Sequence, residues 1–278
     1  MEARTPVEIL DFVSDVGVVK TQRKLPSLLI LAFFAGVFIA FAAEGSSMAA
    51  HNLLANPGTY GLGRLVTGVV FATGLMIVVL AGAELFTGNT LIVVSLLDRR
   101  VTAGQMLKNW CFAYLGNFVG SVFIAWMISQ SGLLNVSGGL LGGMTIKIAA
   151  GKTALAFLPA FLLGIMCNWL VCLAVWVSFG SRDVIGKAVP IFFIICLFVI
   201  SGFEHSIANM YYIPAGILAK ANNAWVAMSG VSAEQLAGLT WGTFIVKNLI
   251  PVTLGNIIGG TVMVGGLYWF ALKKKKAD

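Results

Sequence analysis

The sequence carries very little charge for its length. Asp, Glu, Lys and Arg make up 10% of the 278 residues, whereas hydrophobic residues make up 59%. A water-soluble domain has about 25% charged residues, so this chain lacks the polar side chains that would cover a water-facing surface. The composition therefore excludes an ordinary soluble fold and predicts a membrane protein.

Residues that commonly bind metals or cofactors are also scarce. The chain has two histidines and four cysteines, and all four cysteines lie in apolar stretches without a CxxC pair. There is no His/Cys cluster, no nucleophile motif and no Gly-rich phosphate loop followed by Lys-Ser or Lys-Thr. We therefore expect no metal site, no cofactor and no enzymatic activity, and we expect the cysteines to be small buried apolar side chains.

Apolar runs of about 20 residues, long enough to cross a bilayer, occur six times. The predicted spans are Pro26–Ala50, Arg64–Leu97, Leu107–Gln130, Ala154–Ser178, Ala188–Lys220 and Val246–Leu272. If the loops alternate between two sides, 13 of the 18 Lys and Arg residues lie on the side of the termini and 5 on the other. The positive-inside rule then places both termini and the 98–105 loop in the cytoplasm.

These spans predict an all-α, multi-pass protein of the inner (plasma) membrane, with its transmembrane domain at 26–272. The net charge of +7 does not predict a nucleic-acid partner, because the basic residues cluster at the chain ends and in short loops. Segment 1–25 contains apolar residues at helical spacing, among them Val7, Leu10 and Val13, which predicts an amphipathic helix on the cytoplasmic face. Residues 273–278 form a basic cytoplasmic tail.

The two halves of the chain carry the same residue pattern. The motif G-x-E-x-x-x-x-N begins at Gly82 in the second span and recurs 120 residues later, at Gly202 in the fifth. The third and sixth spans share Lys-Asn, Gly-Asn and Gly positions at a spacing of 139 residues, whereas the first and fourth share only Gly36 and Gly164. Because each half (about 26–130 and 154–272) has three spans, the second half must enter the membrane inverted.

The second and fifth spans are too long and have polar residues at their centres, which predicts a broken helix in each. Non-helical backbone survives at membrane depth only where protein or a water-filled path surrounds it. The half-helices at each break also direct positive N-terminal ends inward, where they favour an anion. We expect Glu84 and Asn89, with Glu204 and Asn209, to have structural roles at the breaks, the carboxylates accepting hydrogen bonds from freed backbone N–H groups. A proton relay or a cation site is the functional alternative for the two glutamates.

Ionisable residues within the spans are candidates for function. His205 lies in the second break and has an ordinary pKa near neutrality, so it is suited to exchange a proton with a weak acid. Lys152 precedes the fourth span on the outer side, where it either attracts anions or is an ordinary interfacial lysine. Asn168 is an amide deep in an apolar run, which either bonds a neighbouring helix or lines a pore.

Five strings in these spans resemble the signatures of the formate/nitrite transporter family. They are Ala81–Asn89, Leu115–Gly120, Asn168–Trp176, Ser201–Met210 and Leu249–Gly260. The resemblance implies an aquaporin-like fold and a homopentamer with one pore per protomer. It also implies passage of monovalent anions of weak acids, such as formate, nitrite or hydrosulfide, with the formate-channel branch favoured.

The resemblance also assigns the residues of the pathway. It implies a cytoplasmic-side constriction of Phe71, Leu75 and Leu85, with Phe86 and Thr87 in the first break. It places Phe198 at the other constriction, His205 at the centre and Lys152 at the outer mouth.

The favoured mechanism has Lys152 gather the anion and His205 pass it a proton, so that a neutral acid crosses the apolar constrictions. Channel-like and proton-coupled operation both stay open. An aquaporin-type facilitator of neutral solutes is the alternative from another class, but the chain lacks the paired Asn-Pro-Ala motifs of such proteins: Asn56-Pro57-Gly58 is a loop without a repeat partner.

Overall fold

The computed structural model describes residues 3–273, and all regular structure in this range is helical. The first half contains α1 (Pro6–Thr21), α2 (Leu25–Ala55), η1 (Pro57–Thr59), α3 (Tyr60–Ala81), α4 (Phe86–Asn89), η2 (Thr90–Ile92), α5 (Val93–Leu97) and α6 (Ala103–Gln130). The second half contains η3 (Leu133–Gly139), α7 (Leu140–Thr153), α8 (Phe157–Ser178), α9 (Val184–Ser201), α10 (Ser206–Ala219), α11 (Asn223–Ser229), α12 (Ala233–Gly238), α13 (Trp241–Thr243), η4 (Phe244–Leu249), α14 (Ile250–Ile258), η5 (Gly259–Gly266) and α15 (Leu267–Leu272).

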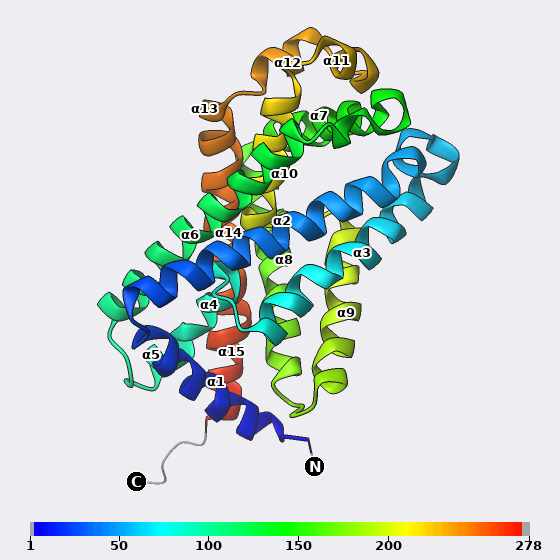
Figure 1. Ribbon diagram of the computed structural model, residues 1–278. Coiled ribbons are helices and arrows are strands. Elements are labelled where there is room, and N and C mark those ends of the chain that lie inside the picture. Colours follow the sequence, from blue (N-terminus) through cyan, green and yellow to red (C-terminus); the bar gives the residue numbers. More distant parts are fainter. Residues whose placement is uncertain (1–2, 274–278) are drawn as a thin grey trace, which may run out of the picture.

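The helices form an elongated bundle whose two ends differ (Figure 1). We call the end that carries α1 and the end of α15 the proximal end (bottom of Figure 1). The opposite end, which carries α7, α11 and α12, is the distal end. Both ends of the described chain therefore lie on the proximal side. Of the predicted tail 273–278, residues 274–278 lie outside the described residues.

Seven helical segments between residues 3 and 273 are long and apolar enough to cross a membrane, one more than the sequence predicts. The additional segment, Leu133–Thr153, has the lowest mean hydropathy of the seven, 1.3. Its backbone is non-helical from Val136 to Gly138. Its longer part, α7, lies across the distal end under α11 and α12 in Figure 1, so this segment belongs to the distal face although its composition permits a span.

Helix α1 forms because Thr5 caps it and because Thr5 and Glu8 bond to each other's backbone N–H groups, a capping box. Its buried residues are Ile9, Leu10, Val13, Ser14 and Gly17. Leu10 and Val13 are buried as predicted, but Val7 is exposed, so the predicted apolar face was partly wrong. The helix packs on α5 and η2 at the proximal end of the bundle.

The predicted breaks are present in both long spans. Helices α3 and α9 end at Gly82 and Gly202, which have φ values of +83° and +80°. Glycine suits both positions because a side chain disfavours this left-handed conformation. The chain then runs without helical structure through residues 82–85 and 202–205 before α4 and α10 begin.

Equivalent close contacts hold the two halves in the same internal arrangement. A Cβ atom on Gly120 of α6 would lie 2.1 Å from the Phe33 carbonyl oxygen, and one on Gly259 would lie 2.4 Å from that of Ile165. Phe33 and Ile165 are 132 residues apart, so the first and fourth spans align at this spacing. The predicted match of Gly36 with Gly164 was therefore wrong by four residues, about one helical turn.

Candidate functional site

Two asparagine side chains repair the backbone at the breaks. The Asn117 side chain accepts a hydrogen bond from the Phe86 N–H (2.9 Å) and donates to the carbonyls of Ala32 and Glu84. Asn256 does the same for the second break, accepting from the Ser206 N–H (2.9 Å) and donating to the carbonyls of Gly164 and Glu204. The sequence predicts that the two glutamate carboxylates accept from this backbone, and that was wrong, because the amides do so instead.

The carboxylates of Glu84 and Glu204 are held by side chains. Asn89 Nδ2 donates to Glu84 Oε2 at 2.8 Å, and Asn209 Nδ2 donates to Glu204 Oε2 at 2.6 Å. Both glutamates are almost completely buried, with exposed fractions of 1% and 5%. Such groups need a cationic partner because an unpaired buried carboxylate is costly.

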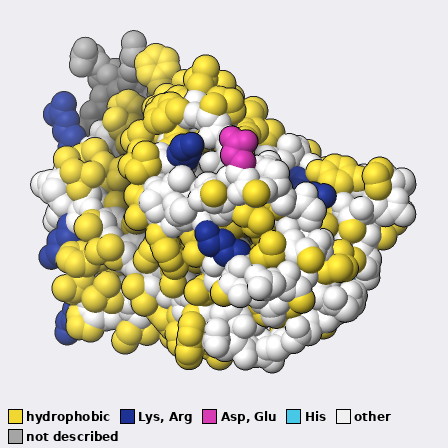
Figure 2. All heavy atoms as spheres, turned by 90° about the horizontal axis from the view of Figure 1, so that it is seen from above, with side chains coloured by type: hydrophobic (Ala, Val, Ile, Leu, Met, Phe, Trp, Pro, Cys, Tyr) yellow, Lys and Arg dark blue, Asp and Glu magenta, His cyan; other side chains and the backbone are white. Residues whose placement is uncertain are grey.

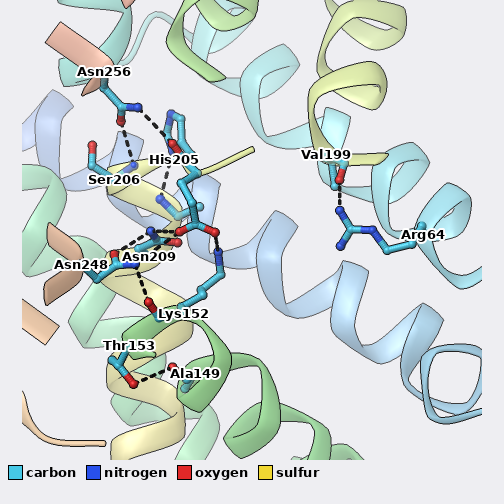
Figure 3. Close-up of polar contacts among 12 residues, drawn as sticks. Arg64, Ala149, Lys152, Thr153, Val199, His205, Ser206, Asn209, Asn248 and Asn256 are labelled. Carbon is cyan, nitrogen blue, oxygen red and sulfur yellow. Dashed lines mark hydrogen bonds and ion pairs between the residues drawn. The ribbon is translucent and has the colours of Figure 1, made fainter. Parts of the chain in front are cut away.

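One lysine in each half supplies that cation. Lys152 Nζ lies 2.7 Å from Glu204 Oε1, and Lys20 Nζ lies 2.9 Å from Glu84 Oε2. The backbone carbonyl of each lysine also accepts a hydrogen bond from an equivalent amide, Asn248 for Lys152 and Asn109 for Lys20. Figure 3 shows Lys152, Asn209 and Asn248 converging on one carboxylate. Lys20 and Lys152 are 132 residues apart, so they are repeat equivalents at opposite ends of the bundle.

The two ion pairs border separate cavities. The proximal cavity has a volume of about 200 Å³ and is lined by Lys20, Arg23 and Glu84 among other residues. The distal cavity, about 620 Å³, is lined by Lys147, Lys152 and Glu204, with further residues. Cations outnumber carboxylates in both linings, and basic side chains predominate over acidic ones on the distal face in Figure 2.

A small apolar void of about 10 Å³ lies between the two cavities, with room for at most about one water molecule. Its lining is made of Ile39, Phe71, Leu75, Leu85, Val171, Ile195, Phe198 and His205. Three pairs in this lining are repeat equivalents, namely Ile39 with Val171, Leu75 with Ile195 and Leu85 with His205. The repeat axis therefore passes through the void.

The predicted constriction residues divide between the two sides of this void. Leu75 and Leu85 also line the proximal cavity. Phe71 and Phe198 line the distal cavity and pack edge to face, with ring centroids 5.8 Å apart. The assignment of Phe71 to the cytoplasmic-side constriction was therefore wrong, since its ring lies beside that of Phe198.

Three other predicted pathway residues, Phe86, Thr87 and Asn168, lie outside the cavity linings described above. The Phe86 ring packs against Tyr114 and Trp110 of α6, and these three residues line a separate cavity rather than the void. Asn168 is fully buried and donates to the carbonyls of Thr87 and Asn256. Phe86 thus packs against a helix, and Asn168 ties α8 to the first break and to α14.

His205 links the two breaks at the void. Its Nε2 lies 3.0 Å from Thr87 Oγ1, and its Nδ1 accepts a hydrogen bond from the Ala208 N–H (3.0 Å) as the N-cap of α10. A ring nitrogen that accepts carries no proton. The ring is therefore neutral in this arrangement, with its proton on Nε2 donated to Thr87.

The sequence alone did not identify several of the residues that form this site. Three basic residues contributed only to the count that predicts the topology: Lys20, Arg23 and Arg64, which also lines the distal cavity. Four asparagines were noted only because they recur in the repeat: Asn109, Asn117, Asn248 and Asn256. The match of Asn117 with Asn256 was a usable signal, because a repeated buried amide implies a repeated bonding task. Glu44, an ionisable residue of the first span, accepts a hydrogen bond from the Tyr211 hydroxyl between α2 and α10 and lies outside the cavity linings described above.

These features define a membrane channel or transporter built from two inverted halves, each with a broken helix whose carboxylate pairs with a lysine at one mouth. The sequence model of the formate/nitrite transporter family matches residues 7–270. The chain belongs to the formate/nitrite transporter family, whose members are channels and transporters rather than enzymes.

Relatives match along nearly the whole chain. The chain is 37% identical to the "Probable formate transporter" of Methanothermobacter thermautotrophicus, over 98% of both chains. It is 39% identical to "Formate channel FocA" of Escherichia coli (strain K12), over 95% of this chain and 93% of the relative. A solved structure titled "Pentameric formate channel with formate bound" matches with a TM-score of 0.78 and 38% identity, covering 89% of this chain and 97% of that one.

Proposed function

We propose that this protein is a channel for small monovalent anions of weak acids, with formate as its main substrate. The proposal rests on one structural arrangement: two cavities with an excess of basic residues lie on either side of an apolar void. Cationic mouths concentrate anions, and an apolar passage excludes charged species. A weak acid satisfies both conditions because it arrives as an anion and crosses in its neutral form.

In this mechanism the anion enters a cavity, is drawn toward Lys20 or Lys152, and takes a proton before it passes the void. The neutral acid then avoids a charge-burial cost of several kcal/mol or more. His205 serves as a neutral N–H donor that orients Thr87 and the passing acid. The ring does not itself cycle through a charged state, because a second proton would need the Nδ1 lone pair that caps α10. The proton therefore comes from a hydronium ion in the cavity, which is left as neutral water.

Formate is preferred to nitrite and hydrosulfide because the relatives described above are named for formate. A neutral-solute facilitator of the aquaporin type is the second candidate. It gains nothing from cations at both mouths, so the charge distribution favours an anion.

The same relatives support a homopentamer, since one solved structure is titled as a pentameric channel. We further propose that the proximal side faces the cytoplasm of the cell, with the inner (plasma) membrane around residues 26–272. The 13-to-5 distribution of basic residues supports this orientation. Residues 3–25 then form the cytoplasmic surface beside the proximal cavity, and the basic tail, of which the structure describes only Lys273, begins on the same side.

An anion flux assay in liposomes tests the function. Formate, nitrite, hydrosulfide, chloride and glycerol are compared at pH 5.5 and 7.5, values we choose to span about one unit on each side of an ordinary histidine pKa. We expect formate to be fastest, faster at the lower pH, and chloride to be excluded because it cannot be neutralised. Chloride flux equal to formate flux would refute the neutral-acid mechanism, and flux of glycerol without formate would support the aquaporin-type alternative.

A further inference from the structure

The distal cavity contains an arginine, Arg64, that has no basic equivalent at the matching position of the other half of the chain. Arg64 projects from α3, and its Nη2 donates to the Val199 and Ile200 carbonyls in the last turn of α9. Figure 3 shows its side chain reaching across to Val199. The same residue lines the 620 Å³ cavity together with Lys152 and His205.

The charge of Arg64 is not cancelled by a carboxylate. The Glu204 carboxylate is already occupied by Lys152 at 2.7 Å, and it also accepts from Asn209 and Asn248. Across residues 3–273 Arg64 forms no ion pair, and its Nε and Nη1 atoms have no hydrogen-bond acceptor. These N–H groups are thus available to a ligand in the cavity.

Arg64 also changes the sign of the helix end beside it. The C-terminus of a helix carries a partial charge of about −0.5 from its unpaired carbonyls. The last turn of α9 lies at the cavity, where Val199 and Gly202 are part of the lining. Without Arg64 this end would repel an entering anion, and with it the local charge is positive.

Each mouth has an arginine in addition to its Lys–Glu pair, and the two arginines are not at equivalent positions of the repeat. At the proximal mouth Arg23 Nε lies 3.1 Å from Glu84, beside Lys20. The repeat spacings of 132 and 120 residues place Leu155 opposite Arg23 and Val184 opposite Arg64. A duplicated sequence alone would not produce this arrangement, so each mouth has acquired charge beyond its repeated Lys–Glu pair. Lys147 also lines the distal cavity, but its side chain is exposed, so water and salt screen its charge more than that of the half-buried Arg64.

We propose that Arg64 is the anion-capturing residue of the distal mouth and binds a small monocarboxylate through its Nη1 and Nε hydrogens before the anion reaches Lys152. This inference rests on the proposed function and identifies which cation sets the apparent affinity on the distal side. Lys152 contributes less to capture because Glu204 cancels most of its field.

The test compares Arg64→Gln and Arg64→Lys in liposomes with known protein orientation. Arg64→Gln should raise the half-saturating formate concentration on the distal side about three- to tenfold, leave the proximal value unchanged, and preserve the maximal flux. Arg64→Lys should recover only part of the wild-type affinity, because its ammonium keeps the charge but cannot donate two parallel N–H bonds to one carboxylate. The difference between Arg64→Gln and wild type should shrink at about 1 M salt, where the Debye length is about 3 Å. Arg4→Gln is the matched control, since Arg4 also donates to a carbonyl at a helix end, that of Phe179, but at the proximal face.

A second pair of variants keeps the test valid if Arg64→Gln does not assemble. Thr67 lies one turn along α3 and also lines the cavity. Thr67→Glu places a carboxylate beside the intact Arg64 and should raise the distal half-saturating concentration, whereas Thr67→Gln should not.

The outcomes separate the two proposals. Absence of formate flux in the wild type would refute the proposed function. Formate flux with equal distal half-saturation in wild type, Arg64→Gln and Thr67→Glu would overturn the inference about Arg64. A loss of maximal flux from both sides that persists at high salt would show that Arg64 only caps α9, and this too would overturn it.

Discussion

The hydroxyl groups of Tyr114 and Thr253 lie 2.8 Å apart and share a hydrogen bond. These residues are 139 residues apart and hold equivalent positions in α6 and α14, so the bond joins the two halves directly at the repeat axis. The void lined by equivalent pairs lies on the same axis. A substitution in one half can therefore be compared with the equivalent substitution in the other half.

Removal of either break-repairing amide should strongly destabilise the protein. Asn117→Ala leaves the Phe86 N–H and two buried carbonyls without their partner, at a cost of about 1–3 kcal/mol for each unsatisfied group. Asn256→Ala should have a similar effect, because its three contacts are equivalent. Thermal unfolding in detergent measures both. Gln130→Ala, which removes only an exposed contact with Ser129, is the control and should be neutral.

The two lysine–glutamate pairs should respond differently to loss of the lysine. Lys152→Gln leaves Glu204 without a cation, whereas Lys20→Gln leaves Glu84 paired with Arg23. Breaking a buried pair costs about 3–5 kcal/mol, so we expect Lys152→Gln to be clearly less stable than Lys20→Gln. Both should weaken flux at low formate concentration more than at saturation, each on its own side.

The double variant Lys152→Gln/Glu204→Gln separates stability from anion capture. It should recover most of the lost thermal stability, because no charge is left unpaired. Equal instability of the single and double variants would mean that the lysine stabilises the fold through packing rather than through charge.

The sequence is sufficient to predict where the two helices break, but not which side chains bond to the broken segments. Gly82 and Gly202 mark a local backbone requirement, and such requirements can be read from a repeated motif. The ion pair of Lys20 with Glu84 joins residues 64 positions apart, and Lys20 lies in a segment that the sequence separates from the spans. The side of the void on which Phe71 lies depends on how α3 packs against α9, and no local pattern encodes that packing.

His205 should influence the rate of flux without setting its pH dependence. Asn in its place can still accept the Ala208 N–H but is too short to reach Thr87. We therefore expect His205→Asn to assemble normally, to show altered formate flux, and to keep the wild-type pH profile between about pH 5 and 8, the range in which a titrating histidine would act. Thr87→Val, which removes the other half of the contact, should change the flux similarly. A flattened profile in His205→Asn would instead show that the ring carries the proton.

Asp98 connects both ends of the chain at the proximal face. Its carboxylate accepts hydrogen bonds from Ser14 of α1 (2.7 Å), Trp269 of α15 (2.8 Å) and Lys273 (2.6 Å). Burial acts to raise the pKa of this group, but the hydrogen bonds from Lys273, Trp269 and Ser14 outweigh it, so the pKa lies below its ordinary value. Folding therefore favours the charged carboxylate, which holds α1 and α15 together.

The stabilisation from Asp98 should depend on pH in one direction. Because the folded-state pKa is lowered, the contribution is complete above the unfolded value of about 3.9 and is lost as the pH falls through the folded-state pKa. Asp98→Asn should thus lower the thermal midpoint at pH 7, and the gap to wild type should close as the pH falls below about 4. Asp15→Asn serves as the control, since its pair with Arg100 is exposed on both sides and such pairs contribute little. A constant difference between wild type and Asp98→Asn across this pH range would show that the side chain acts through its shape and not through its charge.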